Sequence, residues 1–196
     1  MVLARQRERL IDSTQRLVAK RGYQATSVSA IAASAHVARP VFYKAFPGGK
    51  EECLIEAYDQ TIDELFAIGG KSYTAAGGGL DGIEAALRTT LARMAKAPET
   101  AQIALIEIAA LGDLGLKHRD AVLTRIAELL QDALRAIPGS PAISEIKVRA
   151  LLGGCYQLLY LAVTEGRTAE LPALVPDILY MLLAYRLSPK AQGVGS

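Results

Sequence analysis

Four residues in the first quarter of the chain, Arg39, Tyr43, Lys44 and Lys50, have side chains suited to binding a nucleic acid. The forked guanidinium of Arg39 can donate to guanine O6 and N7 together, so Arg39 is the candidate for a base contact. The phenol of Tyr43 and the ammonium groups of Lys44 and Lys50 suit phosphate oxygens. Two alternatives stay open: Tyr43 could belong to the core, and Lys44 could serve only as a solubilising charge.

Other chemistries find little support in the sequence. Only two histidines are present, His36 and His118, and neither lies in an H-x-x-x-H or H-E-x-x-H pattern that would bind zinc. The two cysteines, Cys53 and Cys155, are too few for a disulfide framework or a metal site. There is no G-x-S-x-G elbow and no Walker loop. We therefore predict no catalytic residue, no metal and no cofactor, with a Cys–His pair brought together by folding as the remaining enzymatic alternative.

The candidate DNA-contacting side chains lie in a stretch that predicts two short helices joined by a tight turn. Thr26 is predicted to be the N-cap of the first helix, since its hydroxyl can accept from the exposed backbone N–H groups. Pro40 is tolerated only in a first turn, which places the start of the second helix near Arg39. This pattern is a helix-turn-helix, whose second helix fits the major groove. The predicted bounds are Ser27–Ser34, Ala35–Val37 and Ala38–Ala45.

The N-terminal sequence resembles the TetR family of transcriptional regulators over roughly residues 5–60. It departs from the family at His36, where glycine is usual, at Ala38, where a serine or threonine cap is usual, and at Gly48-Gly49, which is one residue longer. His36 is therefore expected to adopt a positive φ, which is costly for a non-glycine residue. The resembling residues are Gly22-Tyr23, Thr26-Ser27-Val28, Ile31-Ala32, Val37, Phe42-Tyr43, Phe46-Pro47 and Lys50-Glu51-Glu52.

The resemblance implies a ligand-responsive regulator, with a repressor expected, that binds a palindromic double-stranded operator as a homodimer and is released by a small-molecule effector. A helical interaction or ligand-binding protein with little or no specific DNA binding is the alternative, and an enzyme comes third. The residues predicted to face DNA are Thr26, Ser27, Ala38, Arg39, Pro40, Val41, Tyr43, Lys44 and Lys50.

Charge is distributed unevenly along the chain. The first 50 residues contain nine basic and two acidic residues, a net charge of +7, whereas the remainder contains 13 basic and 18 acidic residues, a net charge of −5. A basic N-terminal segment on an acidic body favours an anionic polymer as partner. No stretch approaches the roughly 20 apolar residues of a membrane span, and the first residues contain no apolar signal core. We expect a cytoplasmic protein without a membrane partner.

Apolar residues at helical spacing predict an all-α chain of about nine helices: an N-terminal three-helix DNA-binding domain at 1–47 and a ligand-binding and dimerisation domain at 48–196. Glycine pairs and prolines mark the expected breaks, with loops at Ser72–Gly79 and Pro138–Pro141. The remaining predicted helices are Ala4–Arg21, Lys50–Ile68, Leu80–Lys96, Glu99–Leu111, Leu116–Ile137, Ile143–Glu165 and Leu171–Leu187.

The last two predicted helices are expected to form the dimer interface. The final helix has almost no polar face, so it must be covered on more than one side. The alternative is a central helix in a monomer. The predicted interface residues are Gly153, Gly154, Leu158, Leu161, Leu174, Ile178, Met181, Leu182 and Tyr185.

An effector pocket is predicted inside the body, lined mainly by apolar groups. Glu107 is out of pattern on an apolar helix face, and two interpretations stay open: a pocket carboxylate that selects a cationic or donor-bearing effector, or a structural carboxylate beside an arginine or solvent. The resemblance implies that the effector moves the long helix after Lys50. The predicted lining is Tyr58, Ile62, Phe66, Leu91, Ile103, Glu107, Val122, Tyr156 and Tyr160.

Overall fold

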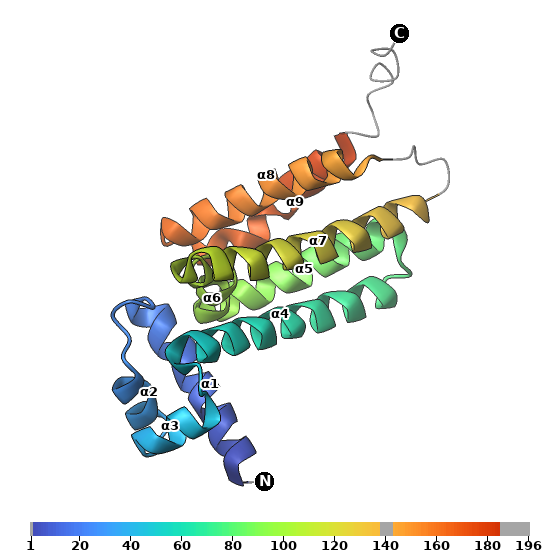
Figure 1. The fold of residues 1–196 in the computed structure, drawn as a ribbon. Helices are drawn as coiled ribbons and strands as arrows, with labels where there is room; N and C mark the ends of the chain where they lie inside the picture. The colour runs from blue at the N-terminus through green and yellow to red at the C-terminus, as the bar shows by residue number, and fades with distance from the viewer. Residues whose placement is uncertain (1, 138–142, 185–196) are drawn as a thin grey trace.

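A computed structural model describes residues 2–137 and 143–184, and over these residues the chain forms nine α-helices, two short 3-10 helices and no strand. The all-α prediction is confirmed. In Figure 1, α1–α3 form a small head at one end of a helical body, and α8 and α9 lie on the side of the body away from α4. The helices are α1 Val2–Arg21, α2 Val28–Ser34, α3 Arg39–Ala45, α4 Gly49–Ala75, α5 Gly79–Lys96, α6 Pro98–Leu105, η1 Glu107–Leu111, α7 Asp113–Arg135, α8 Glu145–Thr164, η2 Thr168–Leu174 and α9 Val175–Ala184.

The head has its own small hydrophobic core, and α4 completes it. Leu10, Ile31 and Phe42, one from each of the three head helices, are 0% exposed. Cys53 and Ala57, in the first turns of α4, belong to the same buried cluster. Further along, α4 packs into the larger core of the body. The boundary at residue 47 stays a prediction, because the packing makes α4 a shared element of head and body.

The fourth helix is longer than predicted. It continues through Gly69-Gly70 to Ala75, so the expected stop at the glycine pair is wrong. A Cβ at Gly69 would lie 3.0 Å from Thr90 Oγ1 and 3.9 Å from Ala86 Cβ of α5. This glycine therefore allows α4 and α5 to pack closely and does not end the helix. The expected loop at 72–79 is correspondingly reduced to three residues, 76–78.

The segment predicted as one helix at 99–111 is divided into α6 and η1, and Gly115 lies inside α7 where a break was expected. Both differences come from one close approach. A Cβ on Gly115 would lie 1.8 Å from the carbonyl oxygen of Ile108, so only glycine lets α7 pack on η1. The predicted loop at 138–141 and the C-terminal tail lie outside the described residues.

This close approach gives a stability prediction. Gly115→Ala should lower the free energy of unfolding by about 1–3 kcal/mol or more, because the new methyl group overlaps backbone and must displace α7 or η1. Gly70→Ala is the matched control: its Cβ would meet nothing within 4 Å, so the variant should gain about 0.5–1 kcal/mol from helix propensity. Urea unfolding followed by circular dichroism measures both, and equal stability of the two variants would contradict the packing described.

Candidate nucleic-acid interface

The third helix buries one face in the head and leaves the other in solvent. Phe42 and Ala45 are buried, whereas Arg39, Tyr43 and Lys44 are exposed. Tyr43 is 43% exposed, so it is not a core residue. Its hydroxyl lies 3.4 Å from Arg39 Nη2, because the two residues are one helical turn apart. The structure therefore brings a guanidinium, a phenol and an ammonium group together on the open face of a short helix.

The turn before α3 has the geometry that the sequence predicted. His36 has φ 53°, and it is the one non-glycine residue with a positive φ in the described part of the chain. Ala38 is the N-cap of α3 and provides no side-chain hydrogen bond, while Pro40 lies in the first turn. Arg9 of α1 donates to the carbonyl oxygens of Ala35 and His36, the latter at 3.1 Å. Sequence reasoning missed this contact, which fixes the strained turn against α1.

Thr26 does not have its predicted role. The N-cap of α2 is Ser27, whose Oγ accepts from the Ala30 N–H at 3.1 Å. Thr26 is 1% exposed, and its hydroxyl donates to the carbonyl oxygen of Gly22 at 2.8 Å. A buried hydroxyl with an internal partner cannot reach a phosphate, so Thr26 stabilises the α1–α2 turn. Ser27 remains exposed.

Lys50 is used inside the protein. Its Nζ donates to the carbonyl oxygens of Tyr23 at 2.7 Å and Thr26 at 2.8 Å, and lies 3.9 Å from the centre of the Tyr23 ring. Partial burial lowers the pKa of Lys50 below its usual value. Lys50 therefore joins the start of α4 to the turn that precedes α2. Its contact with phosphate stays a prediction.

Arg7 was not singled out by the sequence, and it fixes α1 to α3 and α4. Its Nε donates to Glu56 Oε1 at 3.0 Å, Nη1 donates to the carbonyl oxygen of Ala45, and the guanidinium lies 4.3 Å from the centre of the Phe46 ring. The hydrogen bond to Glu56 raises the pKa of Arg7. Three basic groups of the head, Arg7, Arg9 and Lys50, thus have protein partners. The charge free to meet DNA is smaller than +7.

The structure gives Glu107 a partner that neither interpretation foresaw. Its side chain is 8% exposed; Oε2 accepts from the backbone N–H of Tyr23 at 2.8 Å, and Oε1 accepts from Gln102 Nε2 at 3.2 Å. The carboxylate therefore connects η1 of the body to the head. Both oxygens serve this joint, which supports a structural role, although no arginine among the described residues is paired with them. The assignment of Glu107 to the effector pocket stays a prediction.

The other predicted pocket residues do lie together, as parts of the body core. Tyr156 donates its hydroxyl to the carbonyl oxygen of Leu105 at 2.7 Å and stacks on Tyr160 with ring centres 6.2 Å apart. Their role in binding an effector stays a prediction. Tyr58, Ile62, Leu91 and Ile103 are buried in this cluster, and Phe66, Val122 and Tyr156 pack against it partly buried.

The predicted dimer residues differ in how far their own chain covers them. Ile178 and Leu182 are 2% and 5% exposed in the core of their own chain, which corrects their assignment to the interface. The Met181 methyl group covers Gly154, and the interface role of these two residues stays a prediction. Outward-facing positions include Gly153 and Leu161, the latter 40% exposed. Leu158, Leu174 and Met181 are partly buried, and Tyr185 lies outside the described residues. Sequence reasoning missed Tyr180 of α9 and Ile146 of α8, which are 71% and 75% exposed.

The two thiols have the properties of core residues. Burial raises the pKa of Cys53 to about 12, and burial also raises the pKa of Cys155. Cys53 Sγ lies 3.1 Å from Thr14 Oγ1, and no histidine is among its hydrogen-bonding partners. Within the described residues no group of three or more His, Cys, Asp or Glu side chains could bind a metal ion.

The contacts of Lys50 lead to a test that separates structure from DNA contact. Lys50→Met keeps the apolar stem but removes both hydrogen bonds, so it should lower the free energy of unfolding by about 1–2 kcal/mol for this partly exposed cation. Lys44→Met removes the same charge from an exposed residue and should change stability by less than about 0.5 kcal/mol. Thermal unfolding of both variants without DNA makes the comparison. Two equally stable variants would show that Lys50 does not stabilise the head.

Comparison with known proteins agrees with this geometry. Residues 10–57 match the family described as "Bacterial regulatory proteins, tetR family". No curated protein matches the chain. Among solved structures, the transcriptional regulator FadR from Bacillus subtilis in complex with stearoyl-CoA has a TM-score of 0.79 at 18% identity, covering 90% of this chain and 97% of that one.

Two further structures have the same arrangement. The fatty acid degradation regulator FadR from Bacillus halodurans gives a TM-score of 0.75 at 19% identity, over 91% of this chain and 94% of that one. The TetR-family regulator PfmR from Thermus thermophilus gives 0.67 at 20%, over 90% and 95%. At these identities the likeness establishes a shared fold. Residues 10–57 therefore match the TetR family in sequence, and the described chain has the fold of these transcriptional regulators.

Proposed function

We propose that the protein is an effector-released repressor that binds a palindromic operator as a homodimer, with α3 in the major groove. The exposed face of α3, with Arg39, Tyr43 and Lys44 on a helix anchored by Phe42, is the observation that supports DNA binding most directly. Arg39 is the base-reading residue, because it is long, exposed and without an ion pair among the described residues. Tyr43 and Lys44 contact phosphates on either side of the groove.

The roles of Arg39 and Lys44 differ in a measurable way. Arg39→Ala should lower affinity for the preferred operator by about 1–3 kcal/mol and relax base preference at one position of each half-site. Lys44→Ala should weaken all sequences alike and reduce the salt slope by about one for each monomer. Selection of bound genomic fragments followed by titration at two salt concentrations measures both effects. An Arg39→Ala variant that keeps the wild-type base preference would rule out its base contact.

The same titration bears on the alternative of a helical interaction protein. A specific regulator should lose affinity steeply with salt and still prefer one sequence. If a dimer neutralises roughly 6–10 phosphates, affinity should fall about 10³–10⁵-fold between 50 and 200 mM salt. The lower end is expected, because Arg7, Arg9 and Lys50 have protein partners. A flat salt response without sequence preference would favour the interaction protein.

The outer face of α8 supports dimerisation. By length and composition α8 is the one described helix apolar enough to cross a membrane, although only 22% of its apolar window is buried. Helices of soluble proteins can be equally long and apolar. An apolar helix of which so little is buried in its own chain is expected to pack against a second copy of the chain. Gly153 permits close approach of a partner helix, and a Cβ there would meet nothing within 4 Å.

A charge on this face should separate the dimer. Leu161→Glu places a carboxylate at the proposed interface, where an unpaired charge is costly to desolvate. We expect a monomer by light scattering, with weaker operator binding because the two half-sites are no longer linked. Leu129→Glu, at a 54% exposed position of α7, is the control and should remain dimeric. A stable monomeric wild type at micromolar concentration would end the proposal.

The effector is proposed to enter the apolar core of the body between α4, α5, α7 and α8. The body core is aliphatic and aromatic, and Tyr58 and Tyr156 are among its phenol groups. The FadR structure with stearoyl-CoA makes long-chain acyl-CoA the first candidate to test. Stearoyl-CoA should release the protein from its operator, and free CoA, which lacks the acyl chain, should not. Release by both compounds alike would indicate a charge effect and contradict an apolar site.

A further inference from the structure

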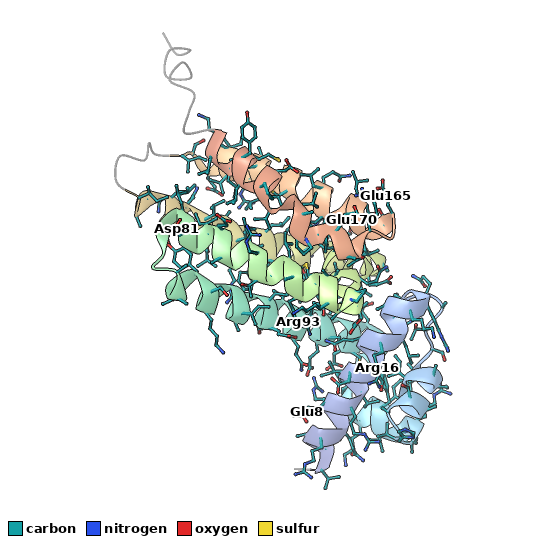
Figure 2. All side chains as sticks on the ribbon, turned by 180° about the vertical axis from the view of Figure 1, so that it is seen from behind. Glu8, Arg16, Asp81, Arg93, Glu165 and Glu170 are labelled. Atoms are coloured by element: carbon teal, nitrogen blue, oxygen red, sulfur yellow. The ribbon has the colours of Figure 1, made fainter. Side chains whose placement is uncertain are left out.

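A groove lies where the head meets the body, away from the core that the effector is proposed to enter. It has a volume of about 380 Å³, within the usual size range of small-molecule sites. Figure 2 shows Arg16 on α1 where this helix passes the end of the body. The lining comes from α1, from the start of α6 and from η2: Arg16, Ala19, Lys20, Pro98, Glu99, Gln102 and Thr168.

The groove has two cations that the protein does not neutralise. Within the described residues, neither Arg16 nor Lys20 has a carboxylate within 4.0 Å, and the hydrogen bond that Arg16 makes is to Ser13 Oγ at 3.2 Å. By contrast, Arg7 and Arg93 have glutamate partners. Glu99 adds one carboxylate to the lining, which leaves an excess of one positive charge. The groove therefore favours a ligand with at least one negative charge.

Its third wall presents further donors. The helix α6 begins at Pro98, and no side chain caps its N-terminus. The positive end of the helix dipole therefore adds to the field of Arg16 and Lys20. Thr168, which is 9% exposed, supplies a hydroxyl group, and Gln102 supplies an amide. Two cations, one carboxylate, a helix N-terminus and two neutral polar groups therefore line one hollow.

The wall of the groove is connected to the DNA-binding head. Gln102 Nε2 donates to Glu107 Oε1 at 3.2 Å, and Glu107 Oε2 accepts from the backbone N–H of Tyr23 at 2.8 Å. The carbonyl oxygen of Tyr23 accepts from Lys50 at 2.7 Å. The amide of Gln102 has two N–H donors. A ligand that turns this side chain toward itself weakens its hydrogen bond to Glu107, and Glu107 fixes the turn that leads into α2.

We propose that this groove binds a small phosphate- or carboxylate-bearing molecule, and that its occupancy alters operator affinity through Gln102, Glu107 and Tyr23. The groove would be a second regulatory site, polar where the body core is apolar. Its effect on operator affinity rests on the proposed function, whereas binding of the anion does not.

The binding step is tested on the full chain without DNA. Inorganic pyrophosphate and succinate, titrated calorimetrically at constant ionic strength, distinguish the two anion chemistries. The double variant Arg16→Gln/Lys20→Gln should bind the preferred anion at least about tenfold more weakly, a loss of about 1.4 kcal/mol. The double variant Arg5→Gln/Arg21→Gln removes the same charge from α1 outside the groove and should bind as the wild type does. Absence of saturable binding of either anion, or equal weakening in both doubles, would overturn the site.

The coupling step uses operator affinity with and without the preferred anion, again at constant ionic strength. Wild-type affinity should change on saturation with the anion. Glu107→Ala lies outside the lining, so it should still bind the anion, but operator affinity should no longer respond. If the alanine variant is unstable, Glu107→Gln takes its place, because its amide oxygen can still accept from the Tyr23 N–H. The operator affinity of this variant should change less on addition of the anion than that of the wild type. An unchanged response in the folded Glu107 variants would refute the relay. If the wild type binds the anion but binds no operator sequence, the proposed function is wrong and the assignment of the groove as an anion site is retained.

Discussion

The backbone of Tyr23 hydrogen-bonds both to η1 of the body and to α4, the helix shared by head and body. Its N–H donates to the buried carboxylate of Glu107, and its carbonyl oxygen accepts from Lys50 at the start of α4. A carboxylate that is 8% exposed is costly to desolvate unless hydrogen bonds compensate it, so removal of its partners would leave an unsatisfied charge. The turn that leads into α2 is therefore fixed from two sides, once by η1 and once by α4. Both elements therefore contact the backbone of the same residue, through the two peptide groups that flank its Cα.

The fourth helix belongs to the hydrophobic cores of both the head and the body. Its first turns close the core of the head, through Cys53 and Ala57, and its middle section packs in the core of the body through Tyr58 and Leu65. Protein cores are close-packed and resist gradual deformation, so the positions of head and body are coupled through this one helix. The ion pair of Arg7 with Glu56 ties α1 to the same helix. Head and body are thus joined by packing and by an ion pair along α4.

The basic residues of the head and of the start of α4 fall into two groups, those with hydrogen-bonding partners inside the protein and those exposed to solvent. Arg7, Arg9 and Lys50 satisfy carbonyl oxygens and a glutamate within the head and its joint with α4, which lets a small domain fix a strained turn at His36. Arg39 and Lys44 remain in solvent on the open face of α3. Some basic residues of this segment therefore stabilise the position of α3, and others leave their charge exposed to solvent. The net charge of the segment overstates the number of exposed, unpaired cations.

Local patterns were sufficient for the sequence to determine the fold class, the helix-turn-helix and the exposed face of α3. Pro40 fixed a helix start and His36 the turn, because backbone restrictions at these residues act within a few positions. Tertiary structure decided what depends on distant partners. Gly69 and Gly115 look like helix breaks but are sites of close helix approach, Thr26 is buried where a cap was expected, and Ile178 and Leu182 face their own core. Glu107 is the clearest case. Its acceptor role involves a backbone N–H 84 residues away, and a backbone group leaves no mark in the sequence that could reveal it.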